Sequence, residues 1–158
     1  MTARARLAAV LDVSPPLVPD ESTIDGVVVS DGIAYVSGVV AFRGAAHPTP
    51  GKVGRELTVA EGAVQAGLAV ANGLYRLEQT LGSLDRIDRI LKLTVFVNAT
   101  ADLVEHPAVA DGGSRVLRDV LGGRGRHARS AIGCVSLPLG APVEIEMIAK
   151  VLDDGRGR

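Results

Sequence analysis

Two residues near the C-terminal end of the chain have side chains that suit the handling of a small organic acid. Arg129 carries a planar guanidinium, which can bind a carboxylate through two parallel hydrogen bonds. Glu144 carries a carboxylate, which can orient and deprotonate a water molecule beside a bound substrate. The plainer alternatives are a salt bridge for Arg129 and a solvated strand position for Glu144. The residue types therefore indicate carboxylate binding and general base catalysis, with a structural alternative for each.

The histidines and the cysteine add little to this chemistry. His47 and His106 have no partner at the spacing of metal ligands, so the sequence predicts no metal site. His127 lies two residues before Arg129, where it could titrate near neutral pH or contact an anion, although a solvated ring is the plainer interpretation. Cys134 is the single cysteine, so the chain can form no internal disulfide and no cysteine-based zinc site.

The elements that must position Arg129 and Glu144 are two expected strands, residues 129–136 and 143–152, joined by a Pro/Gly turn. Side chains alternate faces along a strand, so Val143, Ile145 and Met147 share one face and Glu144 lies on the other. If the two strands are neighbours in a sheet, the Arg129 guanidinium and the Glu144 carboxylate could point into the same space.

The rest of the chain predicts an α+β domain with a mixed sheet. Asp31-Gly32 between two apolar runs indicates a hairpin. Thr58 and Glu61 form a capping box at the start of a long helix that Gly82 should end. Glycines inside this helix are expected to allow close packing against the sheet. The expected elements, in chain order, are strands at 27–30 and 33–40, a helix at 58–81, a strand at 87–98 with Leu91, Leu93, Val95 and Val97 on one face, a helix at 109–121, and the two final strands. This order implies two crossover connections.

Length and composition suit one globular domain and exclude several classes of protein. The chain has 158 residues, of which 47% are hydrophobic and 22% charged. A net charge of −1 and only 3% aromatic residues argue against nucleic-acid binding, and no apolar stretch is long enough to cross a membrane. We expect a cytoplasmic protein with a short N-terminal helix and a Pro-rich connector (1–25), one domain (26–152) and a frayed tail (153–158).

The C-terminal motif resembles that of a known family. Arg129-Ser130, Leu137-Pro138 and Val143-Glu144-Ile145-Glu146 are similar to the C-terminal signature of the YjgF/Rid proteins, the reactive intermediate deaminases, also described as endoribonuclease L-PSP-like. Residues 32–38 and 94–97 agree with the family pattern in the same order. The resemblance covers roughly residues 27–152, and residues 96–102 and 125–131 mark a divergent branch.

The resemblance implies a fold, an assembly and a reaction. It implies a chorismate-mutase-like mixed sheet with two helices on one face, assembled as a homotrimer. In the family, the arginine at the place of Arg129 holds the substrate carboxylate between subunits, the glutamate at the place of Glu144 is linked to water activation, and the glycine at the place of Gly38 borders the site. The reaction is hydrolysis of the reactive imine or enamine of a 2-amino acid to a 2-keto acid and ammonia, without a cofactor. The alternatives are a non-catalytic protein that binds or senses a small carboxylate and, third, a ribonuclease-like activity.

The chain departs from the deaminating members at two positions of their site. Ile24 stands where they carry a tyrosine, and Ala131 stands where they often carry a cysteine. The arginine and the glutamate are retained, so binding of a 2-keto or 2-imino carboxylate is still implied. Whether the chain is an enzyme stays open at this point.

Overall fold

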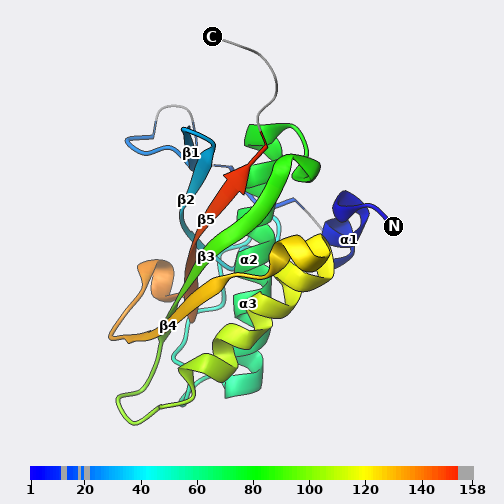
Figure 1. The fold of residues 1–158 in the computed structure, drawn as a ribbon. Coiled ribbons are helices and arrows are strands. Elements are labelled where there is room, and N and C mark those ends of the chain that lie inside the picture. The colour runs from blue at the N-terminus through cyan, green and yellow to red at the C-terminus, as the bar shows by residue number, and fades with distance from the viewer. Residues whose placement is uncertain (12–13, 18, 20–21, 153–158) are drawn as a thin grey trace.

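The computed structural model describes residues 1–11, 14–17, 19 and 22–152. Its elements follow the predicted order behind a short N-terminal helix (Figure 1). The helices are α1 (Ala3–Val10), α2 (Val59–Leu81) and α3 (His106–Leu121), and the strands are β1 (Val27–Ser30), β2 (Ile33–Val40), β3 (Ile87–Asn98), β4 (Ala128–Cys134) and β5 (Val143–Val151). The tail 153–158, which the sequence predicts to be frayed, lies outside the described residues, as do parts of the N-terminal connector.

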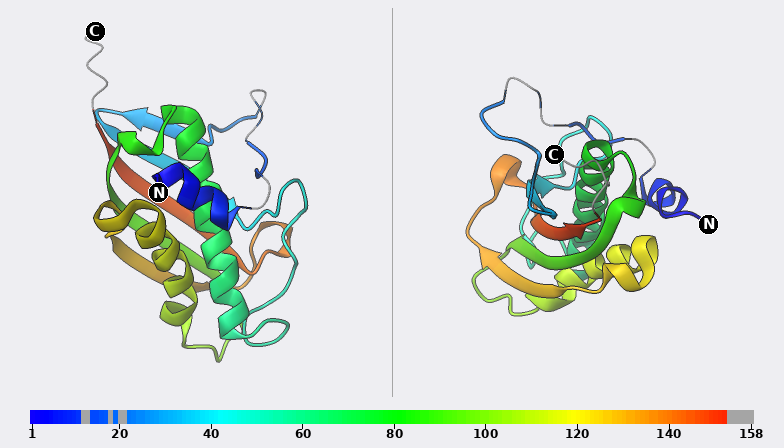
Figure 2. Two further views of the ribbon diagram at one scale, coloured as in Figure 1. Left: turned by 90° about the vertical axis from the view of Figure 1, so that its right-hand side faces the viewer. Right: turned by 45° about the horizontal axis from the view of Figure 1, so that its top comes forward.

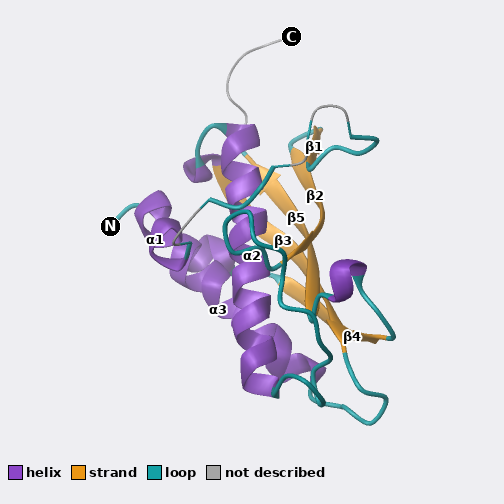
Figure 3. Cartoon of the chain, turned by 180° about the vertical axis from the view of Figure 1, so that it is seen from behind, coloured by secondary structure: helices purple, strands orange, loops and turns teal. Residues whose placement is uncertain are grey.

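The strands form one mixed sheet in the order β1-β2-β5-β3-β4. β1 and β2 pair as the predicted hairpin, and Asp31 and Gly32 both adopt the positive φ that such a turn requires. α2 and α3 lie on the same side of the sheet, as Figure 3 shows from behind. The α+β fold with two helices on one face is therefore confirmed, and α3 provides the crossover that makes β3 and β4 parallel.

The two C-terminal strands are not neighbours, contrary to the arrangement in which Arg129 and Glu144 would share a space. β5 inserts between β2 and β3 and is antiparallel to both, whereas β4 pairs only with β3 among the described strands. The turn at Pro138–Gly140 therefore carries the chain past β3 instead of closing a hairpin. The alternation predicted for β5 is correct, because Val143, Ile145 and Met147 are buried under the helices.

α2 begins and ends where the sequence predicts. Thr58 and Glu61 form the capping box, and Gly82 ends the helix in the left-handed conformation. Gly73 faces the sheet as expected, since a Cβ there would lie 2.5 Å from the Met147 methyl group. Gly67 instead faces α3, where a Cβ would meet the Val116 side chain at 3.2 Å. α2 is thus packed against the sheet on one side and against α3 on another, so its buried residues form more than a single apolar stripe.

β3 spans the predicted residues but does not keep the predicted face throughout. Its pairing with β5 shifts register between Ile90 and Lys92, so the alternation changes phase there. Ile90 and Leu93 are fully buried, whereas Leu91 is 37% exposed. The expectation that Leu91 lies on the core face with Leu93 is therefore wrong, because a bulge cannot be read from apolar periodicity alone.

α1 forms at the N-terminus as predicted and packs on the other helices (Figure 2). The Thr2 hydroxyl caps it by accepting from the Ala5 amide at 3.2 Å. Leu7 is buried, and the Arg6 Nε donates to the Val120 carbonyl at the end of α3 at 2.8 Å. Arg4 pairs with Glu78, a largely buried carboxylate of α2. α1 therefore covers the ends of both long helices.

The crossing of α2 and α3 yields a testable prediction about the core. A Cβ at Gly112 would lie 1.8 Å from the Ala63 carbonyl oxygen, a backbone atom that cannot move aside without displacing α2. We expect Gly112→Ala to destabilise the fold by about 3 kcal/mol or more, which is the upper range for overpacking, as measured by urea unfolding. Gly123→Ala is the control, because a Cβ there meets nothing within 4 Å. Equal stability of the two variants would contradict the close crossing.

Candidate functional site

Arg129 lies on the helix-facing side of the edge strand β4. It is paired in register with Leu93, which is fully buried under the helices. Its guanidinium reaches α3, where Nη1 donates to the Asp111 carboxylate at 2.7 Å and to the Ser114 hydroxyl at 3.0 Å. Nη2 donates to the Pro107 carbonyl at 3.3 Å. Within one chain, Arg129 is thus half-buried and held by α3.

Glu144 lies on the opposite face of the sheet and two strands away. It is opposite Phe96 of β3, which in turn is level with Ile132 of β4, whereas its neighbour Ile145 points into the core. β3 separates Glu144 from Arg129, and the guanidinium pairs with Asp111 instead. Within one chain, the salt bridge that the sequence allows for Arg129 is therefore made with Asp111 and not with Glu144.

Gly38 makes room for the Glu144 carboxylate. The pairing of β2 with β5 shifts register between Val36 and Val39, and Gly38 lies in this irregular segment. A Cβ on Gly38 would lie 2.1 Å from Glu144 Oε1, so only glycine leaves the carboxylate this position. The sequence indicates Gly38 as a place of close approach, and in this chain the group that approaches is the Glu144 side chain.

Burial raises the pKa of the Glu144 carboxyl, and the nearby Glu146 raises it further. The opposing influence is Arg76 of α2, whose positive charge lowers the pKa of Glu144. Arg76 is only 8% exposed, and burial lowers the pKa of its own guanidinium. Its Nη1 donates to the Gly38 carbonyl at 3.4 Å, while its buried Nε has no hydrogen-bond partner. Glu144, Gly38 and Arg76 therefore form one electrostatic cluster.

The sequence does not mark Arg76 as a candidate functional residue. It lies inside a long helix among apolar residues, and nothing in its neighbourhood of sequence marks it as different from a solvated arginine. Its nearest polar contact, Gly38, is 38 positions away in the chain. Only the packing of α2 on the irregular segment of β2 brings the two together.

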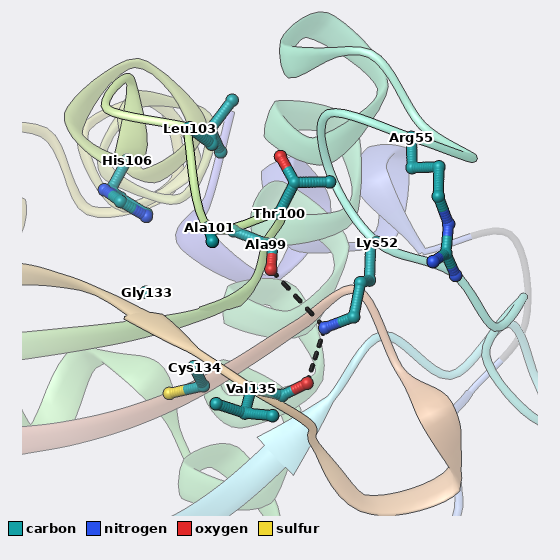
Figure 4. A pocket seen from close by; sticks show the side chains of 10 residues that line it. All are labelled: Lys52, Arg55, Ala99, Thr100, Ala101, Leu103, His106, Gly133, Cys134 and Val135. Atoms are coloured by element: carbon teal, nitrogen blue, oxygen red, sulfur yellow. Dashed lines mark hydrogen bonds between the residues drawn. The ribbon is translucent and has the colours of Figure 1, made fainter.

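A cavity of about 620 Å³ opens where β3 and β4 end and α3 begins (Figure 4). Lys52 lines this cavity, and its ammonium donates to the Asn98 side-chain oxygen at 2.7 Å and to the carbonyls of Ala99 and Val135. His106 borders the other side and lies against Gly133, where a Cβ would be 2.4 Å from its Nε2. Lys52 therefore ties the ends of two strands together, and the sequence contains no signal for this role.

The basic segment before Arg129, residues 124–127, is only partly solvated. Arg124 donates to the Ile87 carbonyl at 2.8 Å and closes the turn after α3, whereas Arg126 is exposed. His127 is half-buried, with Nδ1 2.7 Å from the Gly125 carbonyl and Nε2 3.0 Å from the Ser114 hydroxyl. The plainer interpretation of His127 as a solvated ring is therefore wrong. Ser114, which the sequence does not single out, joins it to Arg129.

A second cavity, of about 520 Å³, lies beside Arg129. The residues that line it are Ser114, Arg118, Arg126, His127 and Arg129, and none of them is acidic. This lining can attract an anion, because three guanidinium groups share one open space.

The residues at which the sequence departs from the deaminating proteins lie apart from this space. Ala131 is half-buried against the core, and Ile24 is 58% exposed at a separate hollow that Arg76 also lines. Cys134 is half-buried at the end of β4. Among the residues that the structure describes, no group of three histidine, cysteine or acidic side chains converges to hold a metal ion. In the same part of the chain, no helix is long and apolar enough to cross a membrane.

Comparisons with known proteins agree with the fold and with the order of these elements. Residues 7–151 match the family described as YjgF/chorismate mutase-like, putative endoribonuclease. The chain is similar to protein TCP17 of Trypanosoma cruzi, with 36% identity over 118 residues that make up 74% of each chain.

Solved structures are similar over nearly the whole chain. The protein Atu1372 of Agrobacterium tumefaciens, of unknown function, is 34% identical with a TM-score of 0.87, covering 96% of this chain and 94% of that one. A putative endoribonuclease of Shewanella oneidensis is 26% identical with a TM-score of 0.88, covering 96% of this chain and 100% of that one. The match to the family pattern and these similarities together show that the chain belongs to the YjgF/chorismate mutase-like family.

Proposed function

We propose that the protein hydrolyses the imine or enamine of a small 2-amino acid, releasing a 2-keto acid and ammonia. Arg129 binds the substrate carboxylate, and Glu144 accepts a proton from the water that attacks the imine carbon. The resulting amino alcohol then loses ammonia to leave the keto group. No step requires a metal or an organic cofactor, since water is the only other reactant.

The observation that carries the proposal is the environment of Glu144. A carboxylate that is half-buried in the space left by Gly38 has a raised pKa, and a raised pKa makes it a stronger base while it is ionised. The Gly38 main chain borders the same carboxylate, so a substrate could approach both. This support does not depend on a tyrosine at position 24 or on a cysteine at position 131.

We infer that the complete site contains two chains, and the positions of Arg129 and Glu144 support this. The two side chains lie on opposite faces of one sheet, so one copy cannot present both to the same small molecule. The sheet face away from the helices also carries apolar side chains that a second copy can cover, among them Val28 at 47%, Tyr35 at 48% and Ile132 at 45% exposed. A homotrimer with Arg129 of one subunit near Glu144 of the next meets both requirements.

One observation favours a second candidate, a binding protein without catalysis. Arg129 already has a carboxylate partner in Asp111, and this pair can serve as a resting state that a ligand carboxylate displaces. Such an exchange needs no base and would suit a sensor of small carboxylates. Ammonia release separates the two candidates, because the binding protein would leave the imine to decay at its rate in buffer.

The experiment that tests the composite site mixes two inactive subunits. The substrate is an imine generated in situ by an amino-acid oxidase, and the measurement is ammonia release above the rate in buffer. Arg129→Ala and Glu144→Gln should each abolish the acceleration. Random co-assembly of the two should restore roughly a quarter of the wild-type rate, since in a closed ring one interface in four then carries both intact side chains. No acceleration by wild type would eliminate the deaminase, and no recovery on mixing would eliminate the two-chain site.

The second prediction concerns competition between Asp111 and the ligand for Arg129. Asp111→Asn removes the competing charge, so a 2-keto acid such as pyruvate should bind about two- to fivefold more tightly in calorimetric titration, the range for an exposed ion pair. Arg129→Lys keeps the charge but loses the planar fork, and should weaken binding by roughly 1.5–3 kcal/mol. Asp119→Asn, an exposed change on the same helix, is the control. Weaker binding by Asp111→Asn would contradict the exchange.

The third prediction follows from the raised pKa of Glu144. A carboxyl whose pKa is higher in the folded than in the unfolded state binds its proton more tightly when folded, so the free energy of unfolding falls as pH rises from its ordinary value of 4.5 through the raised value. Glu144→Gln cannot titrate. Its stability relative to wild type should therefore increase with pH across the weakly acidic range and then level off in urea unfolding. A difference that stays constant over this pH range would contradict the raised pKa of Glu144.

A further inference from the structure

Ser114 and His127 form a hydrogen-bonded pair at the cavity beside Arg129. His127 Nδ1 is 2.7 Å from the Gly125 carbonyl, which can only accept, so Nδ1 carries the proton. In the neutral ring, Nε2 is then an acceptor and takes the hydrogen bond of the Ser114 hydroxyl at 3.0 Å. Arg129 Nη1 donates to the same hydroxyl oxygen at 3.0 Å. The bonds thus run in one direction, from Arg129 through Ser114 and His127 to Gly125.

This direction of hydrogen bonding is the one that activates a serine. A hydroxyl becomes a nucleophile when a base accepts its proton and a third group fixes the tautomer of that base. Here His127 is the base and the Gly125 carbonyl fixes the tautomer. The Arg129 guanidinium adds a positive charge beside the oxygen, which favours its deprotonated form. We propose that Ser114 is a nucleophile that accepts an acyl group from an anionic ester or thioester.

The cavity indicates the class of substrate. Ser114 and His127 are half-buried and line an open cavity of about 520 Å³, so a small acyl compound can reach the hydroxyl. The other lining residues are Arg118, Arg126 and Arg129, and the described part of the chain contributes no acidic residue to the lining, although the Asp111 carboxylate pairs with Arg129. A substrate with a carboxylate at the far end of its acyl chain fits this lining, because Arg118 and Arg126 can bind that carboxylate while the carbonyl lies at Ser114.

The proposed step balances without any further reactant. The Ser114 oxygen attacks the carbonyl carbon as its proton passes to His127 Nε2, and the carbonyl oxygen becomes an oxyanion. The Arg129 guanidinium, whose Nη1 lies 3.0 Å from the attacking oxygen, places a positive charge beside this oxyanion and stabilises it through that charge. The bond to the leaving alcohol or thiol then breaks, and that group takes the proton from His127. Water, deprotonated by His127, releases the acid and restores the hydroxyl.

The inference shares Arg129 with the proposed imine hydrolysis but is independent of it in chemistry. It forms a covalent bond to Ser114, which imine hydrolysis does not, and it needs neither Glu144 nor a second chain. The same hydrogen bonds also connect α3 to β4. If their role were only structural, substitutions of Ser114 or His127 would lower the stability of the fold, and Ser114 would form no covalent adduct.

The test uses a fluorophosphonate that carries a terminal carboxylate, because phosphonylation of an activated serine is irreversible and fluoride is the leaving group. Intact-protein mass after incubation should show one adduct, and peptide mapping should place it on Ser114. The probe with its carboxylate methylated should react at least about tenfold more slowly, because it lacks the charge that the arginines attract. His127→Gln should slow labelling by at least about a hundredfold, the range for loss of a general base.

Ser130→Ala is the matched control, since Ser130 is on the same strand as Arg129 but its hydroxyl accepts from Lys92 instead. Ser130→Ala should label at the wild-type rate, and Ser114→Ala should not label. Thermal melting shows whether each variant is folded. The proposal is overturned if wild type gains no adduct, if the adduct maps to another residue, or if folded Ser114→Ala still reacts. The mapping on wild type decides the question even if Ser114→Ala does not fold.

Discussion

The close crossing of α2 and α3 is the constraint on which the site depends. Gly112 lies directly on the Ala63 carbonyl, and no residue with a Cβ could approach so closely. This contact fixes how near α3 lies to the rest of the domain and therefore how near it lies to β4. Asp111 and Ser114, one residue before and two after Gly112, reach Arg129 because of it. The site at β4 is thus positioned by helix packing and not by the strand alone.

Arg129 and Glu144, the two charged groups of the candidate site, are stabilised by different means. Arg129 is satisfied by a carboxylate, a hydroxyl and a carbonyl of α3, and these hydrogen bonds offset part of the cost of removing its charge from water. Among the described residues Glu144 has no such pairing, and its pKa is raised because burial and the nearby Glu146 outweigh the attraction of Arg76. Arg76 itself is deeply buried with an unpartnered Nε. A buried charge without a full set of partners reduces the stability of the fold. Such groups are typical of sites that bind a ligand or catalyse a reaction.

The cavity at the ends of β3 and β4 shows how a loop can be structural and still border an open space. The Lys52 ammonium donates to three neutral oxygens and thereby ties the segment before α2 to both strand ends. Asn98, whose oxygen is one of them, uses its amide to bond the Gly51 and Ala141 carbonyls. This polar network fixes the position of the chain as it leaves β3 toward α3. Lys52 and His106 both line the open space beside this network (Figure 4).

The sequence by itself determined the local elements and the family, because their signals come from neighbouring residues. The Asp31-Gly32 turn, the capping box at Thr58 and the Gly82 cap depend on contacts within a few positions, and each forms as predicted. The buried face of β5 follows from strict alternation along one strand. The bulge that exposes Leu91 does not, because it depends on the register of β3 with its partner.

Only the tertiary structure decided which side chains meet. β5 inserts between β2 and β3, so β3 lies between the strand of Glu144 and the strand of Arg129. This order depends on strand pairing between segments that are distant in the sequence. Ser114 is 13 positions from His127, and Arg76 is 38 from Gly38. Contacts between residues so far apart produce no recognisable pattern in the sequence. Each partner, judged from its neighbours alone, looks like an ordinary helix or loop residue. The chemistry of Arg129 and Glu144 could therefore be suggested from residue types, whereas their partners were fixed by packing alone.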